Sequence, residues 1–419
     1  MPPLLFALFL GIGWWGAGDG QQHDPPGKNQ PATQGDPTFT KDIAWLLAKK
    51  CLKCHVPDGH APFSLITYAE VKKRAGLIRQ EAMVRRMPPT DGTSDYGMVA
   101  SQDALTDEEI VMIQEWVRLG MPEGDAKDAP PEFKPPTDWA LGKPDLVLSL
   151  PKPKPVLDEG RAYWMAYSLP AGKLFGKRLR AVDVRPAAPK AVRQVVIAQD
   201  PKRALSKKDK GGGFETFGSL RPVLRTSLDL VATWAQGCDP WFPRMAPFDV
   251  TSKDLAVQVL YQPTGKPEDA NVEIAFYFST EPPSGVKWVN LTIPSYTINP
   301  EDSPTLTQSY TVPSDSLLYG LYPEARFYCV RMNVTLKTSS GDESTILSIY
   351  TWDPYWAGSY LFRTPVGLPK GSKVVAEFLY DNSKHSGLNN GKEPKPIPFG
   401  NALNQEMFGL AMLIGPAGN

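Results

Sequence analysis

The sequence is poor in histidine and has no excess of either charge. Its 419 residues include only four histidines, and Lys plus Arg number 45, as do Asp plus Glu. The net charge is therefore zero, so no overall field favours nucleic acid or an anionic membrane surface. We expect no nucleic-acid partner. A site that needs several imidazole ligands is also disfavoured, because only His23, His55, His60 and His385 could supply them.

The chain also lacks an apolar run of membrane-spanning length. The run from Leu4 to Trp15 is shorter than the ~20 residues that a spanning helix needs, and small residues follow it. This pattern predicts a signal peptide or anchor over residues 1–18, although no Lys or Arg precedes the run. We expect a protein exported to a bacterial periplasm, which contacts the membrane only if this segment stays uncleaved.

Cysteine is scarce as well, and the four cysteines fall into two pairs. Cys51 and Cys54 stand in "CLKCH", where His55 follows directly. Cys-x-x-Cys-His is the attachment signature of a c-type haem: the two thiols bond to the porphyrin and the histidine reaches the iron. We predict one covalent haem c here. Cys238 and Cys329 remain for a disulfide, if the compartment is oxidising.

Met87 is the predicted second axial ligand of the iron. In "RRMPPT" two prolines follow it and keep its loop extended. A thioether suits iron and raises its reduction potential. Met83 and Met112 compete but stand at helical spacing, so we expect them in the core, and Met98 lies in a polar loop. His60 could bind iron instead, although we expect a loop residue.

Proline abundance and hydrophobic periodicity divide the chain. The 43 prolines are about twice the usual share, which favours a loop-rich β protein with stiff linkers. Helical spacing and a capping-box pair, Thr106 and Glu109, indicate helices before residue 122. Period-two alternation predicts strands at 255–261 and 272–278. The expected segments are a signal peptide or anchor (1–18), a flexible tether (19–37), a cytochrome c domain (38–122), a Pro-rich linker (123–155) and two β-sandwich subdomains (156–285 and 286–419).

Several motifs carry a resemblance to a known family. "CLKCHVPDGHAPFSLITY", "RRMPPT" and "LTDEEIVMIQEWVRLGMPEGD" resemble the haem domain of bacterial proteins in which a cytochrome c module precedes a copper type II, ascorbate-dependent monooxygenase-like module. "VATWAQGCDPWFP", "VQVLYQPTGKPED" and "NQEMFGLAMLI" continue the resemblance. It implies the peptidylglycine and dopamine monooxygenase fold for the second part. The expected fold class is thus multidomain, a small all-α cytochrome c domain followed by an all-β tandem sandwich.

The copper ligands that this resemblance implies are largely missing. The family holds one copper by a His pair and a later His, and a second by His-x-His and Met. The corresponding positions here are Arg193, Gln194 and Leu260, then Glu324, Ala325, Arg326 and Met407. Only Met407 keeps a ligand type, and two guanidinium groups stand where a cation should bind. We therefore expect no copper cofactor.

Three other features could form ligand sites. Cys329 and Met407 could form a soft, partial Cu(I) site, but two ligands without imidazole make a weak site. His385 lies in a polar, turn-like segment and is expected at the surface. The aromatic run "YTWDPYWAGSYLF" could form a ligand platform, although aromatic residues at β spacing more often pack in a core.

The expected function follows from the motif and the missing ligands. We expect an exported monohaem c-type cytochrome that exchanges electrons with a redox partner protein. Its β part is expected to be copper-free, non-catalytic and devoted to binding a partner or ligand, so the chain is not expected to be an enzyme. Two alternatives stay open. One is a haem-coupled, copper-dependent monooxygenase with relocated ligands, and the other is a haem-based redox or gas sensor or structural subunit.

Overall fold

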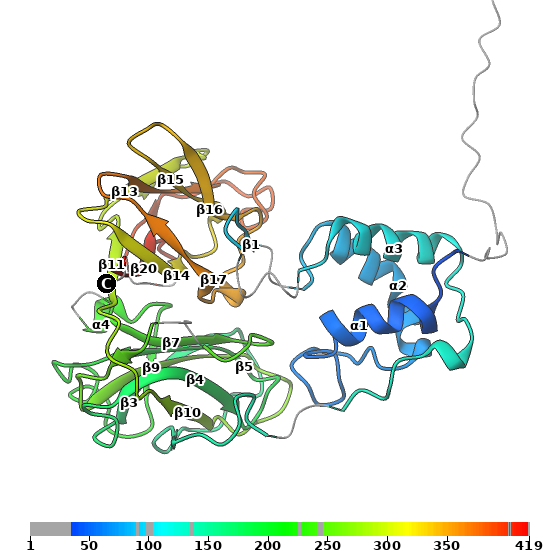
Figure 1. Cartoon of the computed structure of the whole chain (residues 1–419), viewed down its shortest axis with the longest axis horizontal. Coiled ribbons are helices and arrows are strands. Elements are labelled where there is room, and N and C mark those ends of the chain that lie inside the picture. Colours follow the sequence, from blue (N-terminus) through cyan, green and yellow to red (C-terminus); the bar gives the residue numbers. More distant parts are fainter. Residues whose placement is uncertain are drawn as a thin grey trace, which may run out of the picture.

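A computed structural model describes residues 35–88, 92–97, 104–134, 138–224, 228–241, 246–400, 402 and 404–417. The chain is mostly β, with a helical segment beside stacked sheets (Figure 1). Within these residues no helix is long and apolar enough to cross a membrane. The predicted signal segment, most of the predicted tether, His23 and Met98 lie outside the described residues.

The helical segment has its own apolar core. Its elements are η1 (Phe39–Ile43), α1 (Ala44–Lys50), α2 (Tyr68–Met83), α3 (Asp107–Arg118) and the short η3 (Ala126–Asp128). Capping boxes begin α2 and α3, because the side chains of Thr67 and Thr106 and those of Glu70 and Glu109 satisfy the first backbone N–H groups. Fully buried Trp116 lies in the core between these helices.

The predicted fold class is wrong, because the chain is mostly β and the range 38–122 is not an all-α cytochrome c domain. Between α2 and α3 the strand β1 (Gly92–Thr93) pairs with β16 (Glu343–Ile349) of the last sheet. Gly92 allows this close approach, since a Cβ there would lie 2.7 Å from the ring of Tyr360. Helical periodicity carried no sign of a two-residue strand, so the sequence did not show that this segment joins a distant sheet.

The first β half contains two antiparallel sheets that share one core. Leu, Val, Ile and aromatic side chains from the facing strands fill the space between the sheets. β2 contributes to this half although it lies in the predicted linker. In spatial order the sheets are β2 (Leu146–Ser149), β10 (Val272–Phe278), β4 (Arg178–Pro186) and β8 (Phe248–Asp249), and then β6 (Phe214–Thr216), β3 (Tyr163–Pro170), β9 (Asp254–Tyr261), β5 (Val192–Gln199) and β7 (Leu230–Ala235).

The second β half repeats this arrangement with a separate core. A short pair, β12 (Thr297–Ile298) and β19 (Ile397–Pro398), lies outside its two larger sheets. The short α4 (Arg221–Leu224) and η4 (Pro354–Trp356) lie in connections. The larger sheets are β11 (Lys287–Thr292), β20 (Gly409–Pro416), β14 (Ser316–Glu324) and β17 (Tyr360–Leu368), and then β1, β16, β15 (Cys329–Lys337), β18 (Lys373–Tyr380) and β13 (Thr305–Thr311).

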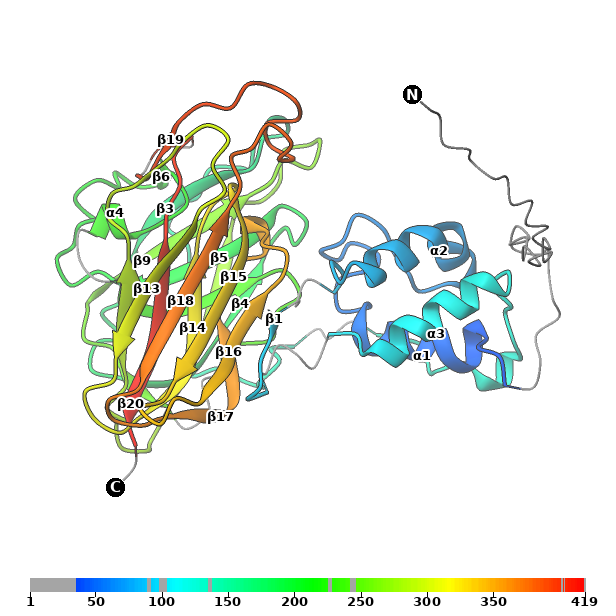
Figure 2. The same cartoon turned by 90° about the horizontal axis from the view of Figure 1, so that it is seen from above.

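The two halves pack against each other through their inner sheets, so the four large sheets form a stack (Figures 1 and 2). Small side chains on facing strands, including Ala198 and Ala256 from one half and Ala411 from the other, allow the sheets to approach. Tyr322 of β14 fills the remaining space. The sheet that contains β9 is therefore covered on both faces, and every residue of β9 is buried.

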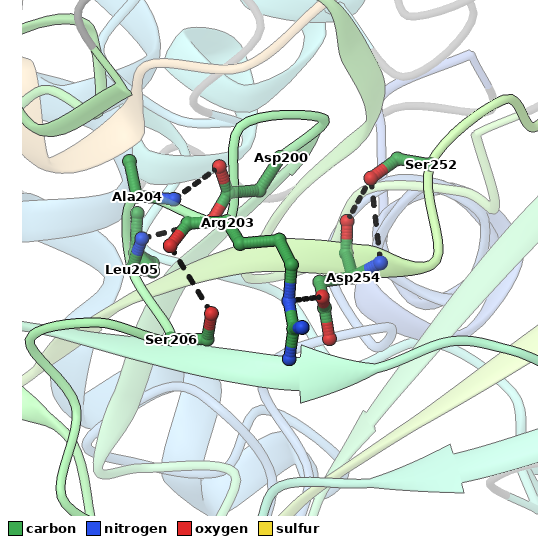
Figure 3. A network of polar contacts seen from close by, with 7 residues as sticks. All are labelled: Asp200, Arg203, Ala204, Leu205, Ser206, Ser252 and Asp254. Carbon is green, nitrogen blue, oxygen red and sulfur yellow. Dashed lines mark hydrogen bonds and ion pairs between the residues drawn. The ribbon is translucent and has the colours of Figure 1, made fainter.

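A loop after β5 lies against the start of β9 (Figure 3). The carboxylate of Asp200 accepts hydrogen bonds from the backbone N–H groups of Ala204 and Leu205, each at 2.8 Å. Arg203 pairs with Asp254 at the start of β9, with Nε 2.7 Å from Oδ2. These contacts hold the fully buried side chain of Leu205 in the core between the two halves.

Candidate functional site

The Cys-x-x-Cys-His motif forms a single turn at the end of α1. The N–H of Cys51 donates to the carbonyl of Leu47 at 2.8 Å, which closes the helix. The N–H groups of Cys54 and His55 then donate to the carbonyl of Cys51, at 3.1 and 3.0 Å. This backbone places the two thiols and the imidazole within one turn, the local geometry that the motif predicts.

The imidazole of His55 is oriented by the loop that follows it. Its Nδ1 lies 3.0 Å from the carbonyl oxygen of Phe63, and the two rings pack at 4.7 Å. Burial lowers the pKa of His55, so the ring is neutral near pH 7 and Nδ1–H donates to the carbonyl. The remaining nitrogen, Nε2, is then the acceptor that could bind a metal, since a ligating histidine commonly donates its other N–H to a carbonyl. Cys51, Cys54 and His55 thus fit a covalently attached haem.

The motif lies at the junction between the helical segment and the first β half. The imidazole of His60 has its Nδ1 3.1 Å from the carbonyl of Pro189 and packs on Trp234 at 5.6 Å. Gly237, which has a φ of +77°, faces Cys54, and a Cβ there would lie 2.4 Å from the Sγ atom. Any group bound to Cys54 would therefore lie beside the loop that follows β7.

The other predicted iron ligands have different outcomes. Met87 lies half-buried just after α2, and its role as an iron ligand stays a prediction. Met83 was expected in the core, which is wrong because it is 54% exposed. Met112 packs against the core of the helical segment as expected. His60 contacts the β half, as described above.

The description of the chain as a metal-binding cytochrome c is corrected by the side chains as well as by the fold. Among the described residues no group of three or more His, Cys, Asp or Glu side chains could hold a metal ion. The side chains of the described residues therefore do not support a metal-binding cytochrome c. A haem iron takes most of its ligands from the porphyrin, so this finding does not test covalent attachment at Cys51 and Cys54.

The predicted disulfide between Cys238 and Cys329 is not formed. Cys329 is buried in the core of the second β half, where burial raises the pKa of its thiol, whereas Cys238 is exposed after β7. Cys329 belongs to that core and Met407 lines a cavity between the two β halves, so the soft copper pair of these two residues stays a prediction. His385 is exposed, as expected for its turn-like segment.

A cavity of about 50 Å³ lies between the two β halves. Its walls come from the inner sheets of both halves and from η4. Of the positions that the sequence resemblance singled out, all except Arg193 line it: Gln194, Leu260, Glu324, Ala325, Arg326 and Met407. The volume suits a few water molecules or one small ion or molecule. The fold thus gathers these positions from both halves around one space.

Glu324 is fully engaged at the edge of this cavity. It is buried and forms an ion pair with Arg221, whose Nε lies 2.5 Å from its carboxylate. Ser219 donates a second hydrogen bond from its hydroxyl at 2.9 Å, and Arg221 also donates to the side chain of Asn290. Glu324 is thus paired mainly with Arg221, and its negative charge balances the nearby guanidinium of Arg326 only in part.

Arg326 is buried beside it with a different set of partners. Its guanidinium donates to the backbone carbonyls of Phe217, Ala402 and Gln405, while its Nε is buried without a hydrogen-bond partner. Burial lowers the pKa of Arg326, which is only 7% exposed. The guanidinium forms no ion pair within the described part of the chain.

Glu406 ties the loop before β20 to the end of β14. Its carboxylate accepts hydrogen bonds from the backbone N–H groups of Arg326, Met407 and Tyr328, at 2.5, 2.8 and 2.9 Å. The side chain is fully buried, and this burial raises its pKa to about 7. Near neutral pH the carboxyl is therefore only partly ionised and only partly balances the charge of Arg326.

Arg193 lies behind the cavity rather than in its wall. It stacks on Trp356 at 4.7 Å and donates to Gln236 at 3.1 Å. The amide of Gln236 donates to Pro189 at 2.8 Å, the same carbonyl that His60 contacts. Part of the aromatic run thus holds a cation, which the expectation of simple packing did not include.

Sequence reasoning missed three residues of this region, Trp164, Gly218 and Arg221. Trp164 and Gly218 line the cavity, and Arg221 neutralises Glu324. No motif marks them, because their relation to Arg326 arises only when the two β halves pack together.

Comparisons with known proteins add little. No family model matches the chain, and no curated protein matches its sequence, so the resemblance described above stays a prediction. Among solved structures, N-glycanase F (PNGase F) is 12% identical, with a TM-score of 0.26, and the match covers 65% of this chain and all of that one. The major capsid protein P2 of bacteriophage PM2 is 10% identical, with a TM-score of 0.23, over 64% of this chain and 97% of that one. Likenesses this weak support no conclusion about fold or function.

Proposed function

We propose that the chain is an exported electron-transfer protein that holds one haem covalently through Cys51 and Cys54, with His55 as an iron ligand. The observation that supports this most is the Nδ1–H of His55 donating to the carbonyl of Phe63 within the Cys-x-x-Cys-His turn. This bond leaves Nε2 for the iron and fixes the plane of the ring. When bound, the haem supplies a reversible one-electron couple.

The residues beside the Cys-x-x-Cys-His turn determine from which side a partner could exchange electrons with the haem. Gly237 and Trp234 of the first β half lie against this loop through Cys54 and His60. The β half would therefore cover one side of the group, and a redox partner would approach from another. Met87 remains our proposal for the second axial ligand.

We propose further that the β part binds a ligand or partner and does not catalyse copper chemistry. Gln194, Leu260 and Arg326 supply an amide, an alkyl chain and a cation to the cavity wall, and none of these groups is a good copper ligand. Met407 alone would offer a thioether. The cavity is more suited to a small polar ligand than to copper.

The test is production of the full chain in a bacterial host with c-type haem attachment machinery. We expect about one haem per chain, still bound after denaturation, by mass spectrometry and the absorption of the pyridine complex. Cys51→Ser with Cys54→Ser should lose it, whereas Cys238→Ser, the control, should keep it. A wild-type chain that exports and folds without covalent haem would refute the proposal.

A further inference from the structure

Two N–H groups lie beside Gly218 in the cavity wall, where the glycine leaves the place of a side chain empty. Gly218 lines the cavity, and a Cβ at that residue would lie 3.6 Å from Nε of Arg326 and 3.8 Å from Nε1 of Trp164. Nε of Arg326 has no hydrogen-bond partner. Nε1 of Trp164 forms no hydrogen bond within the described residues. The two donors come from different β halves, so they meet only in the assembled stack.

The positive charge of Arg326 is only partly balanced by the carboxyl groups near this space. Arg326 is more than nine-tenths buried, and its partners are neutral carbonyl groups. Glu324 is paired with Arg221, and the carboxyl of Glu406 is hydrogen-bonded to backbone N–H groups, so both balance the charge of Arg326 only in part. A buried cation whose charge is only partly balanced is costly, because burial removes the water that would otherwise solvate it.

We propose that this cavity binds a small carboxylate or similarly small oxyanion, held by Arg326 and by the indole N–H of Trp164. An oxygen of the anion would accept from both donors above Gly218, and its charge would balance the guanidinium. The aromatic wall, which includes Phe217 and Phe327, restricts the ligand to a few heavy atoms. This inference rests on the ligand-binding half of the proposed function and is independent of the haem.

The experiment is a calorimetric titration of the purified full chain with formate and acetate, with acetamide as an uncharged analogue. We expect saturable binding of the anions and none of acetamide. Trp164→Phe keeps the ring but removes the N–H, and should weaken binding about tenfold, the usual effect of losing one hydrogen bond to a charged group. Arg326→Gln should abolish binding, and Arg331→Gln, an exposed arginine of β15, should leave it unchanged.

Each result decides the matter. Absence of anion binding to the wild-type chain, equal binding of acetamide, or equal binding in the Trp164→Phe variant would overturn the proposal. The Trp164→Phe variant guards against misfolding of Arg326→Gln, since it changes one N–H group. Haem content, measured on the same samples, would separate failure here from failure of the electron-transfer proposal.

Discussion

The buried carboxyl of Glu406 should make the protein less stable as the pH rises from about 4.5 to about 7. Burial raises its pKa from 4.5 to about 7, so over this interval the folded chain keeps a proton that the unfolded chain has released. Stability therefore falls with rising pH. A shift of about 2.5 units corresponds to about 3 kcal/mol at 1.36 kcal/mol per unit.

The matched variant is Glu406→Gln, which cannot ionise. Its Oε1 can still accept from Arg326 and Met407, but its amide group would face the N–H of Tyr328, so we expect a pH-independent loss of about 1 kcal/mol. Denaturant unfolding at several pH values would give the free energy of unfolding of both proteins. Other titrating groups far from Glu406 cancel in the difference.

Below pH 4.5 the wild type should be more stable than the variant by about 1 kcal/mol. The difference should fall by about 3 kcal/mol by pH 7 or above, so that the variant becomes the more stable protein by about 2 kcal/mol. Tyr328, Cys329 and Tyr380 also lie near Glu406, but their pKa values are raised, so they do not titrate in this range. A difference that is constant with pH, or that grows as the pH rises, would refute the argument that burial dominates at Glu406.

Three further outcomes are expected. Gly237→Ala should lower the free energy of unfolding by at least about 1 kcal/mol and reduce haem attachment, since its Cβ would overlap Sγ of Cys54; unchanged urea unfolding and haem yield would contradict this. Met87→Ala should lower the reduction potential and remove any sulfur-to-iron absorption band, and an unchanged spectrum would assign another ligand. Arg221→Met should cost about 3–5 kcal/mol by leaving Glu324 buried and unpaired, and adding Glu324→Gln should recover part of it; no recovery would count against the ion-pair argument.

The sequence predicted individual strands and helix ends better than it predicted how the β halves pack together. The alternation at 255–261 and 272–278 is confirmed by β9 and β10, and the pair Thr106 and Glu109 forms the predicted capping box. Alternation usually means one buried and one exposed face, yet β9 is buried on both because the second β half covers it. Such packing depends on residues far along the chain, which local periodicity does not contain.

Of the two candidate sites, one could be predicted from the sequence and the other could not. The Cys-x-x-Cys-His turn was visible as five adjacent residues, because its geometry is local. The anion site was not, since Trp164, Gly218 and Arg326 lie on three separate segments and become neighbours only through the fold. The unpaired Nε of Arg326 can be recognised only when its surroundings are known.

The pairing of β1 with β16 has a consequence for biogenesis. Gly92 pairs with Ile349, and the whole first β half lies between these two residues in the sequence. Gly92 can therefore form this contact only after Ile349 has been synthesised. Contacts of this kind form late, since the intervening chain has to be synthesised and ordered first. The Cys-x-x-Cys-His turn is close to the N-terminus and would emerge long before its β covering. If a haem is attached at this turn, both thiols are therefore open to attachment before the β part has folded beside them.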